Sequence, residues 1–384
     1  MKLLYYSPSS YGGLADYAHE QANALANLGI EVTFMCTPNY PKNRGELYQT
    51  LPVLQDDLNQ KQSNKVIKVV RHINTTVSNY QTLAKTITTQ DFNAVLLGSY
   101  AEYFAPIWAG NLKKLAQAGV VFGAIVHDPV RDFVLGPPWW HRWSIAAAYS
   151  FLTHAFVHEP IELDTGRFTP QLQTTVIPHG IYQFPQATLS QQSAREALGI
   201  PPDARVMLAF GHIRDGKNLD LVLQAMAQFS DLYLLVAGKE QSSGQRPVIC
   251  YQKLAEKLNV AERCRWHVRF IPEREVGNFF VASDLVLLTY SEAFRSASGV
   301  LNATVNYRKP CLASSGESVL KSVVEKYQLG IWVFPDSVEA IVNGLNRWMN
   351  ADFHSKWDQY IAENSWPLNA KLVLSKFNQL PIKE

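Results

Sequence analysis

The chain has 384 residues, more than one hydrophobic core usually supports, so two domains of ordinary size are expected. Hydrophobic residues make up 47% and charged residues 18%, with no low-complexity tract, which excludes a disordered chain. The formal net charge of +2 excludes a broad nucleic-acid-binding surface and a strong general attraction to anionic lipid, because both need clustered lysine and arginine.

Cysteine spacing and hydropathy set further limits. The four cysteines are widely spaced and form no CxxC pair, so the sequence predicts neither a zinc site nor a disulfide framework. The first residues, MKLLYYSPSS, contain no long apolar region, and no stretch offers about 18 uncharged apolar residues. We therefore expect a cytoplasmic protein that is neither secreted nor membrane-spanning.

The first 38 residues predict a strand, a glycine loop, a helix and a second strand. The run KLLYYSP passes through Gly12 and Gly13 into the helical pattern LADYAHEQANALANLG, which ends at Gly29, and EVTFMCTP follows as a strand. Such βαβ units build parallel sheets. Helical patterns separate the further strands expected in the first half, which are NAVLLGS near residue 95, VVFGAIVHD near 123, THAFVHE near 156 and TTVIPHG near 177.

The second half repeats this alternation of strands and helices. Strands are expected at RVMLAFGHI, LYLLVAG, WHVRFI, LVLLTYS and PCLASS, and helices at NLDLVLQAMAQF, RPVICYQKLAEKLN, REVGNFFVAS and SGVLNATVNYR. The fold class is therefore α/β, with two doubly wound Rossmann-like domains. We place them at residues 1–184 and 190–359, joined near the segment from Pro185 to Ser193.

A basic loop leads from the strand RVMLAFGHI into the next helix, within the segment from Phe210 to Met226. His212, Arg214 and Lys217 are concentrated there. A diphosphate needs paired positive charge and backbone N–H donors, and a basic loop beside a helix N-terminus supplies both. The alternative is a solvated basic turn without a ligand.

This segment resembles the GT-B glycosyltransferases, specifically the retaining enzymes of family four, and the resemblance runs over nearly the whole chain. In that family an arginine and a lysine of this loop bind the donor's diphosphate. Lys217 matches the lysine, whereas His212 stands where the arginine is commoner, and Arg214 substitutes for it. The resemblance implies two domains that face each other across a cleft.

The segment from Tyr290 to Ser314, YSEAFRSASGVLNATVNYRKPCLAS, resembles the family's donor-binding loop and helix. The family pattern is a glutamate on the sugar side, seven residues, and a second glutamate on the ribose. If Glu292 is taken as the first glutamate, the position of the second glutamate is Val300. If the alignment instead runs backward from KPCLAS, the position of the second glutamate is Asn302. This chain therefore departs from the acidic pair of the family.

Small residues begin the helix in this same segment. Ser296, Ser298, Gly299 and Val300 offer free N–H groups and little bulk, which suits phosphate oxygens. Asn302 can bind ribose hydroxyls, because its amide both donates and accepts hydrogen bonds. The alternative is a serine-capped helix that only packs on the sheet.

Three further features of the chain match family positions. Gly12 and Gly13 correspond to the glycine-rich loop near the donor phosphates and acceptor, where glycine lets the backbone approach a ligand; an ordinary tight turn is the alternative. His127, in the motif VHDP with Asp128, occupies the position of a histidine that faces the donor sugar, and a capping or core histidine is the alternative. His158 and His179 also resemble family positions, the latter mainly structural.

Two segments bear on the acceptor and the domain arrangement. The tryptophan-rich stretch from Gly136 to Val157 is either an interfacial surface that meets a lipid-linked acceptor at the inner face of the membrane, or a helix buried against the first sheet. The C-terminal stretch ENSWPLNAKLVLSKF resembles the family's closing helix, so we assign residues 360–384 to the first domain.

The resemblance implies retaining, metal-independent transfer of a hexose-type sugar from a nucleoside diphosphate sugar to a glycan, lipid-linked or small-molecule acceptor, without a cofactor. Arg214 and Lys217 would neutralise the leaving diphosphate and His127 would orient the sugar. The altered acidic motif leaves a second hypothesis, a non-catalytic subunit that binds a sugar nucleotide. A third is a sugar-nucleotide epimerase on the same fold.

Overall fold

The computed structural model of the chain divides into two compact units. Unit 1 comprises Met1–Gly180 together with the chain from Asn364 onward, and unit 2 comprises Ile181–Glu363. The structure describes residues 1–41, 47–56, 65–99, 101–127, 129, 131, 134, 136–241, 244–295 and 298–378.

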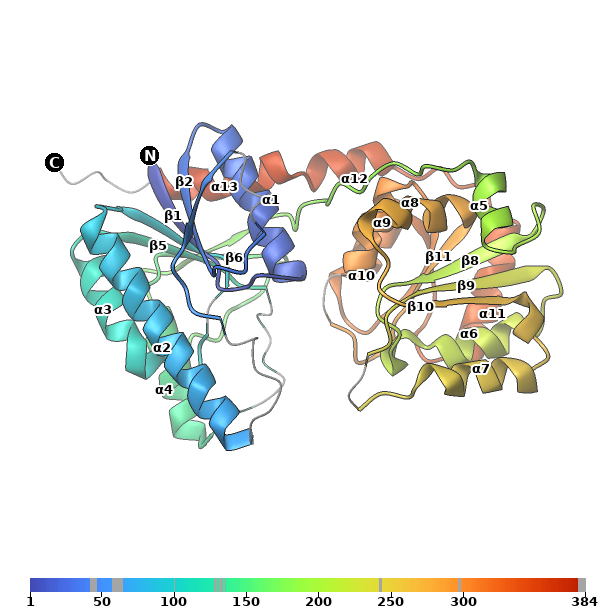
Figure 1. Ribbon diagram of the computed structural model, residues 1–384, viewed down its shortest axis with the longest axis horizontal. Coiled ribbons are helices and arrows are strands. Elements are labelled where there is room, and N and C mark those ends of the chain that lie inside the picture. The colour runs from blue at the N-terminus through green and yellow to red at the C-terminus, as the bar shows by residue number, and fades with distance from the viewer. Residues whose placement is uncertain are drawn as a thin grey trace. The chain divides into compact units, whose positions relative to one another are not determined.

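Unit 1 is built on a parallel sheet covered by helices on both faces (Figure 1). The strand order is β3-β2-β1-β4-β5-β6-β7. Helices α2, α3 and α4 cover one face, and α1 and α13 cover the other. The bounds are β1 Lys2–Tyr6, α1 Gly13–Asn27, β2 Glu31–Cys36, β3 Gln49–Pro52, α2 Lys65–Thr89, β4 Ala94–Leu97, α3 Ala105–Gln117, β5 Val121–Ile125, α4 Pro138–Tyr149, β6 His154–Val157, β7 Gln173–Val176 and α13 Trp366–Phe377.

Unit 2 has a second parallel sheet in the order β10-β9-β8-β11-β12-β13. Helices again lie on both faces (Figure 1). The bounds are α5 Gln191–Ala197, β8 Arg205–Phe210, η1 Asp215–Lys217, α6 Leu219–Met226, β9 Leu232–Gly238, α7 Val248–Lys257, η2 Ala261–Arg263, β10 Cys264–Val268, α8 Glu273–Ala282, β11 Leu285–Thr289, α9 Gly299–Asn306, β12 Cys311–Ser314, α10 Val319–Lys326, β13 Gly330–Trp332, α11 Val338–Met349 and α12 Trp357–Glu363.

The central strands are hydrophobic because both of their faces are covered. Every residue of β11, LVLLT, and of β12, CLAS, is buried. Continuous apolar runs of this kind are typical of parallel sheets between two helical layers. The prediction of two Rossmann-like doubly wound units is confirmed. The short strand β3 was not expected, because its four residues QTLP are mostly exposed and carry no apolar run.

The C-terminal helix α13 belongs to unit 1, where it packs on α1. Asn369 is fully buried in this interface, and its amide nitrogen donates to the hydroxyl of Tyr17 at 2.8 Å and to the carbonyl of Pro178 at 2.7 Å. Gln21 of α1 donates to the amide oxygen of Asn369 at 2.7 Å. Because unpaired buried amides are costly, this network specifies how α13 docks.

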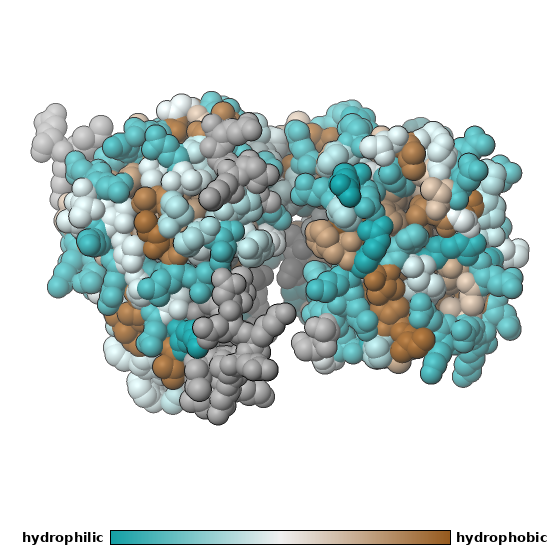
Figure 2. Space-filling model, viewed as in Figure 1, coloured by the Kyte–Doolittle hydropathy of each residue, from teal (hydrophilic) through white to brown (hydrophobic). Residues whose placement is uncertain are grey.

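No helix in the described residues is long and apolar enough to cross a membrane. On the face that Figure 2 shows, apolar residues form small separate groups among hydrophilic ones. Exposed apolar residues scattered in this way are usual on folded proteins.

Gly180 gives a test of the α13 contact. Its φ is +82°, and an added Cβ would lie 2.4 Å from the ring of Trp366. Gly29 has nearly the same φ, +83°, with no atom within 4 Å of an added Cβ. We expect Gly180→Ala to lower the free energy of unfolding by about 2 kcal/mol more than Gly29→Ala, because only the first adds a steric overlap to the backbone strain. Urea denaturation of both variants measures this, and equal losses would contradict the packing of Trp366 on Gly180.

Candidate functional site

The basic loop of unit 2 begins at the carboxyl end of β8. Gly211 has a φ of +84°, which turns the chain out of the strand. A short 3₁₀ turn, Asp215–Lys217, and a left-handed Asn218 with φ +53° then precede α6. The loop therefore lies at the sheet edge where α/β proteins bind ligands, as the sequence predicted, with an additional turn before the helix.

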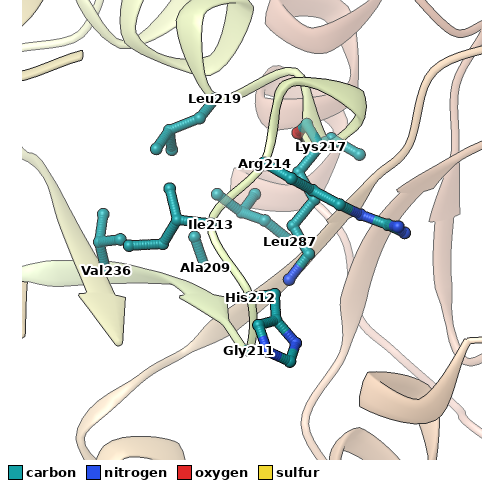
Figure 3. Close-up of a pocket in the computed structure, with 10 residues that line it drawn as sticks. Ala209, Gly211, His212, Ile213, Arg214, Lys217, Leu219, Val236 and Leu287 are labelled. Carbon is teal, nitrogen blue, oxygen red and sulfur yellow. Dashed lines mark hydrogen bonds between the residues drawn. The ribbon is translucent and has the colours of Figure 1, made fainter. Parts of the chain in front are cut away.

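The side chain of Lys217 folds back over this loop. Its Nζ donates to the carbonyl oxygen of Phe210 at 2.5 Å. Figure 3 shows the amine directed toward Gly211 and His212, while the guanidinium of Arg214, which also lines this pocket, points away from that amine. Burial, and then the charge of Arg214, lower the pKa of Lys217 to about 7. A lysine in this state is stabilised in its charged form by a bound anion.

Arg214 is held by aromatic residues. Its guanidinium carbon lies 5.9 Å from the ring centroid of Phe294, which stacks on Tyr290 at 4.0 Å. The hydroxyl of Tyr290 is 2.8 Å from Oγ of Ser298. A cation over an aromatic face is attracted to the ring quadrupole, so this contact orients Arg214 without neutralising its charge.

The carboxylate inside the basic loop is directed elsewhere. Asp215 accepts hydrogen bonds from Arg246 at 2.9 Å and from the hydroxyl of Tyr251 at 2.7 Å. Asp220 also pairs with Arg246, at 3.1 Å. In the described part of the chain, no carboxylate pairs with Lys217, so the positive charge of this pocket is left for a ligand.

His212 is exposed on the same loop. Burial of part of its ring, and then the charges of Lys217, Arg214 and Lys239, lower its pKa. The ring is therefore neutral at pH 7 and contributes hydrogen-bonding capacity and no charge. This is the main electrostatic difference from a loop with arginine at that position.

The loop after β11 is fastened to the basic loop. Thr289 donates from its hydroxyl to the carbonyl of Lys217 at 2.9 Å, and the N–H of Ser291 donates to the carbonyl of Gly216 at 3.0 Å. Asp336 joins both loops, accepting from the amide of Asn218 at 2.7 Å. The second oxygen of Asp336 accepts from the backbone N–H of Glu292 at 2.9 Å.

Asp336 was not recognised from the sequence as part of this site. Its position shortly after β13 places it at the same carboxyl edge as the other loops. A carboxylate after a strand end was the only signal available in the sequence, and it did not show that two loops would donate to it.

Helix α9 begins beside the basic loop. A Cβ added at Gly211 would lie 3.4 Å from Nζ of Lys217 and 3.5 Å from the side chain of Val300. The backbone N–H groups of Gly299 and Val300 donate to none of the residues that the structure describes, as is usual for the first turn of a helix. The lysine amine and the first turn of α9 therefore lie close to the same position beside Gly211.

Ser298 caps this helix. Its hydroxyl accepts from the N–H of Leu301 at 3.3 Å and contacts Tyr290, and its side chain is buried. The hydroxyl of Ser298 is thus committed within the protein, and the backbone of Gly299 and Val300 is the part of the cradle open to a ligand.

Three other residues of unit 2 were expected to bind the sugar donor, and they lie in different surroundings. Glu292 has a 61% exposed side chain that lies 3.8 Å from Arg295. Asn302 is buried on α9. Ser296 lies outside the described residues. The geometry groups Arg214 and Lys217 with the start of α9, and it leaves the roles of Glu292, Ser296 and Asn302 as predictions.

Gly12 and Gly13 lie in unit 1, at the carboxyl end of β1. Gly12 has a φ of +79° and precedes α1, and no atom lies within 4 Å of a Cβ added at either glycine. The backbone there is open, as close approach by a ligand requires. A contact with donor phosphates stays a prediction.

His127 follows β5 in unit 1. Its Nε2 lies 3.1 Å from the carbonyl of Gly98, and its Nδ1 lies 3.4 Å from Nε2 of His158. Burial, and then the charge of His179, lower the pKa of His127 to about 4, so the ring is neutral at pH 7. Because both nitrogens already have protein partners, a sugar hydroxyl would have to share one of them. Asp128 lies outside the described residues.

The tryptophan-rich segment contains a helix that packs on the first sheet, and contact of its exposed residues with a membrane stays a prediction. Helix α4 buries Ile145, Ala148 and Tyr149 against the sheet, while the side chains of Trp139 and Trp143 are 65% and 52% exposed.

Among the described residues, no group of three or more His, Cys, Asp or Glu side chains is placed to hold a metal ion.

Residues 190–365 match the family described as glycosyl transferases group 1. A D-inositol 3-phosphate glycosyltransferase of Mycobacterium ulcerans is 36% identical over 108 residues, which are 27% of this chain and 22% of that protein. The chain therefore aligns with less than a quarter of that relative's length.

Solved structures match nearly the whole chain. Sucrose-phosphate synthase from Thermosynechococcus elongatus superposes with a TM-score of 0.69 at 16% identity, over 98% of both chains. Anabaena HepE in complex with UDP and glucose superposes with a TM-score of 0.67 at 13% identity, over 99% of this chain and 100% of that one. The whole chain therefore has the GT-B fold of these structures, and its residues 190–365 match the glycosyl transferases group 1 family.

Proposed function

We propose that the protein transfers a hexose-type sugar, with retention and without a metal ion, from a nucleoside diphosphate sugar to an acceptor bound by unit 1. The observation that carries the proposal is the cationic pocket of unit 2. Lys217 lies beside the first turn of α9, and Arg214 lines the same pocket. Asp215 is paired to Arg246. The pocket thus has a net positive charge at the carboxyl edge of the sheet.

These residues would act mainly when the bond between sugar and phosphate breaks. Negative charge then develops on the diphosphate, and a buried lysine with free backbone N–H groups stabilises it more in the transition state than before. The low pKa of Lys217 supports this role, because an anion is what the buried ammonium lacks.

Retention is proposed through front-face departure assisted by the phosphate. Glu292, the acid of the donor segment, is largely exposed and lies near Arg295, which gives it no position as a nucleophile. His127 is neutral, so its role would be to orient the sugar through a hydrogen bond.

The relatives suggest which substrates to try first. HepE was solved with UDP and glucose, so UDP-glucose is the first donor. The mycobacterial relative is named for D-inositol 3-phosphate, so a phosphorylated polyol belongs among the acceptors, beside glycans and lipid-linked sugars.

Replacing Lys217 tests the proposal. We expect Lys217→Ala to lower donor turnover at least about tenfold, because it removes charge from the leaving diphosphate. Lys253→Ala, an exposed lysine of α7 in the same unit, is the matched control and should retain turnover. Unchanged turnover in Lys217→Ala would overturn the assignment. Nucleotide binding without turnover across acceptors would favour a non-catalytic subunit, and donor conversion without an acceptor would favour an epimerase.

The pKa of Lys217 also predicts a pH dependence of donor binding. The free lysine is charged below its pKa of about 7 and loses its proton as the pH rises. A bound diphosphate would raise this pKa, so the Kd for UDP-glucose should rise by up to about tenfold per pH unit above 7. Calorimetry between pH 7.5 and 8.5 measures it, with proton uptake seen from buffers of different ionisation enthalpy. Lys217→Gln should bind weakly and without this slope; a flat wild-type profile would contradict the prediction.

Peripheral contact with an anionic membrane is proposed for the face formed by α3 and α4. A pocket between these helices is lined by Lys113, Trp143 and Arg167, and small residues form its floor. Trp139 and Trp143 stack with ring centroids 6.5 Å apart. Exposed tryptophans beside cations suit the boundary between headgroups and acyl chains.

The double variant Trp139→Ala, Trp143→Ala tests this contact. We expect it to weaken binding to vesicles that contain anionic lipid at least about tenfold, because two large amphipathic side chains are lost. Phe270→Ala removes a more exposed aromatic residue, 75% against 65% and 52% for the two tryptophans, from unit 2 and should bind as the wild type does. Equal sedimentation of all three proteins with the vesicles would show that this face does not meet the membrane.

A further inference from the structure

Three neighbouring strands of unit 1 each lead into a histidine. His127 follows β5, His158 follows β6 and His179 comes shortly after β7. These strands are adjacent in the sheet and parallel, so the three rings lie at one carboxyl edge. The ring centroids of His127 and His158 are 5.4 Å apart, and those of His158 and His179 are 4.9 Å apart.

Tyr17 of α1 occupies the centre of this group. Its ring centroid lies 4.6 Å from that of His127, 5.4 Å from that of His158 and 5.2 Å from that of His179. Its hydroxyl accepts from Asn369. Burial raises the pKa of Tyr17, so the phenol stays neutral, and its ring packs against the three histidine rings.

The nitrogens of two of these rings form a continuous series between two carbonyl oxygens. Nδ1 of His158 lies 3.3 Å from the carbonyl oxygen of Ile177. Nε2 of His158 lies 3.4 Å from Nδ1 of His127. Nε2 of His127 lies 3.1 Å from the carbonyl oxygen of Gly98. Three contacts thus link four ring nitrogens.

A count of protons shows that the three contacts compete. A neutral imidazole has one N–H, and a carbonyl oxygen can only accept. The two neutral rings therefore supply two protons for three contacts, and one contact must lack a hydrogen bond. A third proton would satisfy the whole series and would give the pair one positive charge.

The environment disfavours that third proton at neutral pH. Burial, and then the charge of His179, lower the pKa of His127 to about 4. Burial, and then the charges of His179 and His127, hold the pKa of His158 well below its ordinary value. In the described part of the chain, no carboxylate acts on either pKa, and Tyr17, Trp366 and Asn369, which pack here from α1 and α13, are uncharged. The two rings are neutral together.

The shortest contact places the first proton, and the relative basicity of the two remaining acceptors places the second. The shortest, between His127 and Gly98, would place a lone pair against an oxygen at 3.1 Å if Nε2 had no proton, so Nε2 of His127 has one. The second proton then lies on Nε2 or on Nδ1 of His158. An imidazole nitrogen is more basic than an amide oxygen, so Nδ1 of His127 is the stronger acceptor, and Nε2 of His158 donates to it.

We propose that His158 is a positioning residue for His127, which it fixes as the tautomer with the proton on Nε2 by donating a hydrogen bond to Nδ1. If His127 faces the donor sugar, as the proposed function holds, a sugar hydroxyl oxygen would share the Nε2 proton with the carbonyl of Gly98, and Nδ1 would not be available as an acceptor. This inference rests on the proposed function only for that last consequence.

The tautomers are measured by nitrogen-15 spectroscopy of the full chain, labelled at histidine, at pH 7.5 with no donor present. We expect a pyrrole-type resonance for Nε2 and a pyridine-type resonance for Nδ1 in both His127 and His158. His354, with an 84% exposed side chain, is the internal reference for a ring that exchanges between tautomers. A proton found on Nδ1 of His127 or on Nδ1 of His158 overturns the proposal.

Two substitutions separate positioning from packing. His158→Gln keeps an amide N–H near the position of Nε2 and should preserve the spectrum of His127. His158→Phe keeps a ring without a donor and should move the Nδ1 resonance of His127 downfield, toward that of an unbonded nitrogen. An unchanged His127 resonance in a folded His158→Phe protein overturns the proposal, and the wild-type spectrum decides it if that variant does not fold.

The same variants keep the two proposals distinguishable. If the wild type turns over a donor, we expect kcat to fall in His158→Phe and to be largely retained in His158→Gln. If the wild type shows no turnover, the proposed function fails while the spectra still decide the tautomer. If turnover is present and the spectra differ from expectation, only the role of His158 is overturned.

Discussion

The site of unit 2 depends on one energetically unfavourable feature, the ammonium group of Lys217 in a half-buried pocket. Among the described residues that line this pocket, none is a carboxylate that could neutralise this ammonium group. Desolvation lowers its pKa to about 7, so at neutral pH the protein holds an ammonium close to losing its proton. The nearby acid Asp215 would relieve this, yet Arg246 and Tyr251 bind it instead. The arrangement destabilises the empty pocket and favours an anion in it, which is the usual compromise between stability and function.

Keeping such a cation in place requires that the surrounding loops do not relax toward water. Thr289 holds the backbone of Lys217, and Asp336 joins Asn218 to the N–H of Glu292. Each of these bonds connects chain at or after the end of one strand with chain that follows a different strand. The basic loop, the loop after β11 and the chain after β13 therefore act as one preorganised assembly. Hydrogen-bond donors that are already in place need little reorganisation when charge develops on a ligand.

Much of this could be predicted from the sequence, because hydrophobic runs and strand-end loops are local features. The apolar strands gave both sheets, and the position of Arg214 and Lys217 before a helix gave the site. The link through Asp336 could not be predicted, since it joins residues more than 100 positions apart in sequence. The strand β3 carries no apolar run. Ser298 was expected near phosphate, but its hydroxyl caps α9, and only the backbone beside it remains available.

Burial lowers the pKa of His127, His158 and His179 in unit 1 as well, but there it leaves neutral rings and not a charge. Burial lowers the pKa of His127 as it lowers that of Lys217, but a histidine begins near 6.5 and a lysine near 10.5, so at pH 7 the histidine is neutral while the lysine is still partly charged. One unit therefore offers charge, and the other offers hydrogen bonds of fixed direction. A charged pocket suits a diphosphate, and neutral groups of this kind suit sugar hydroxyls.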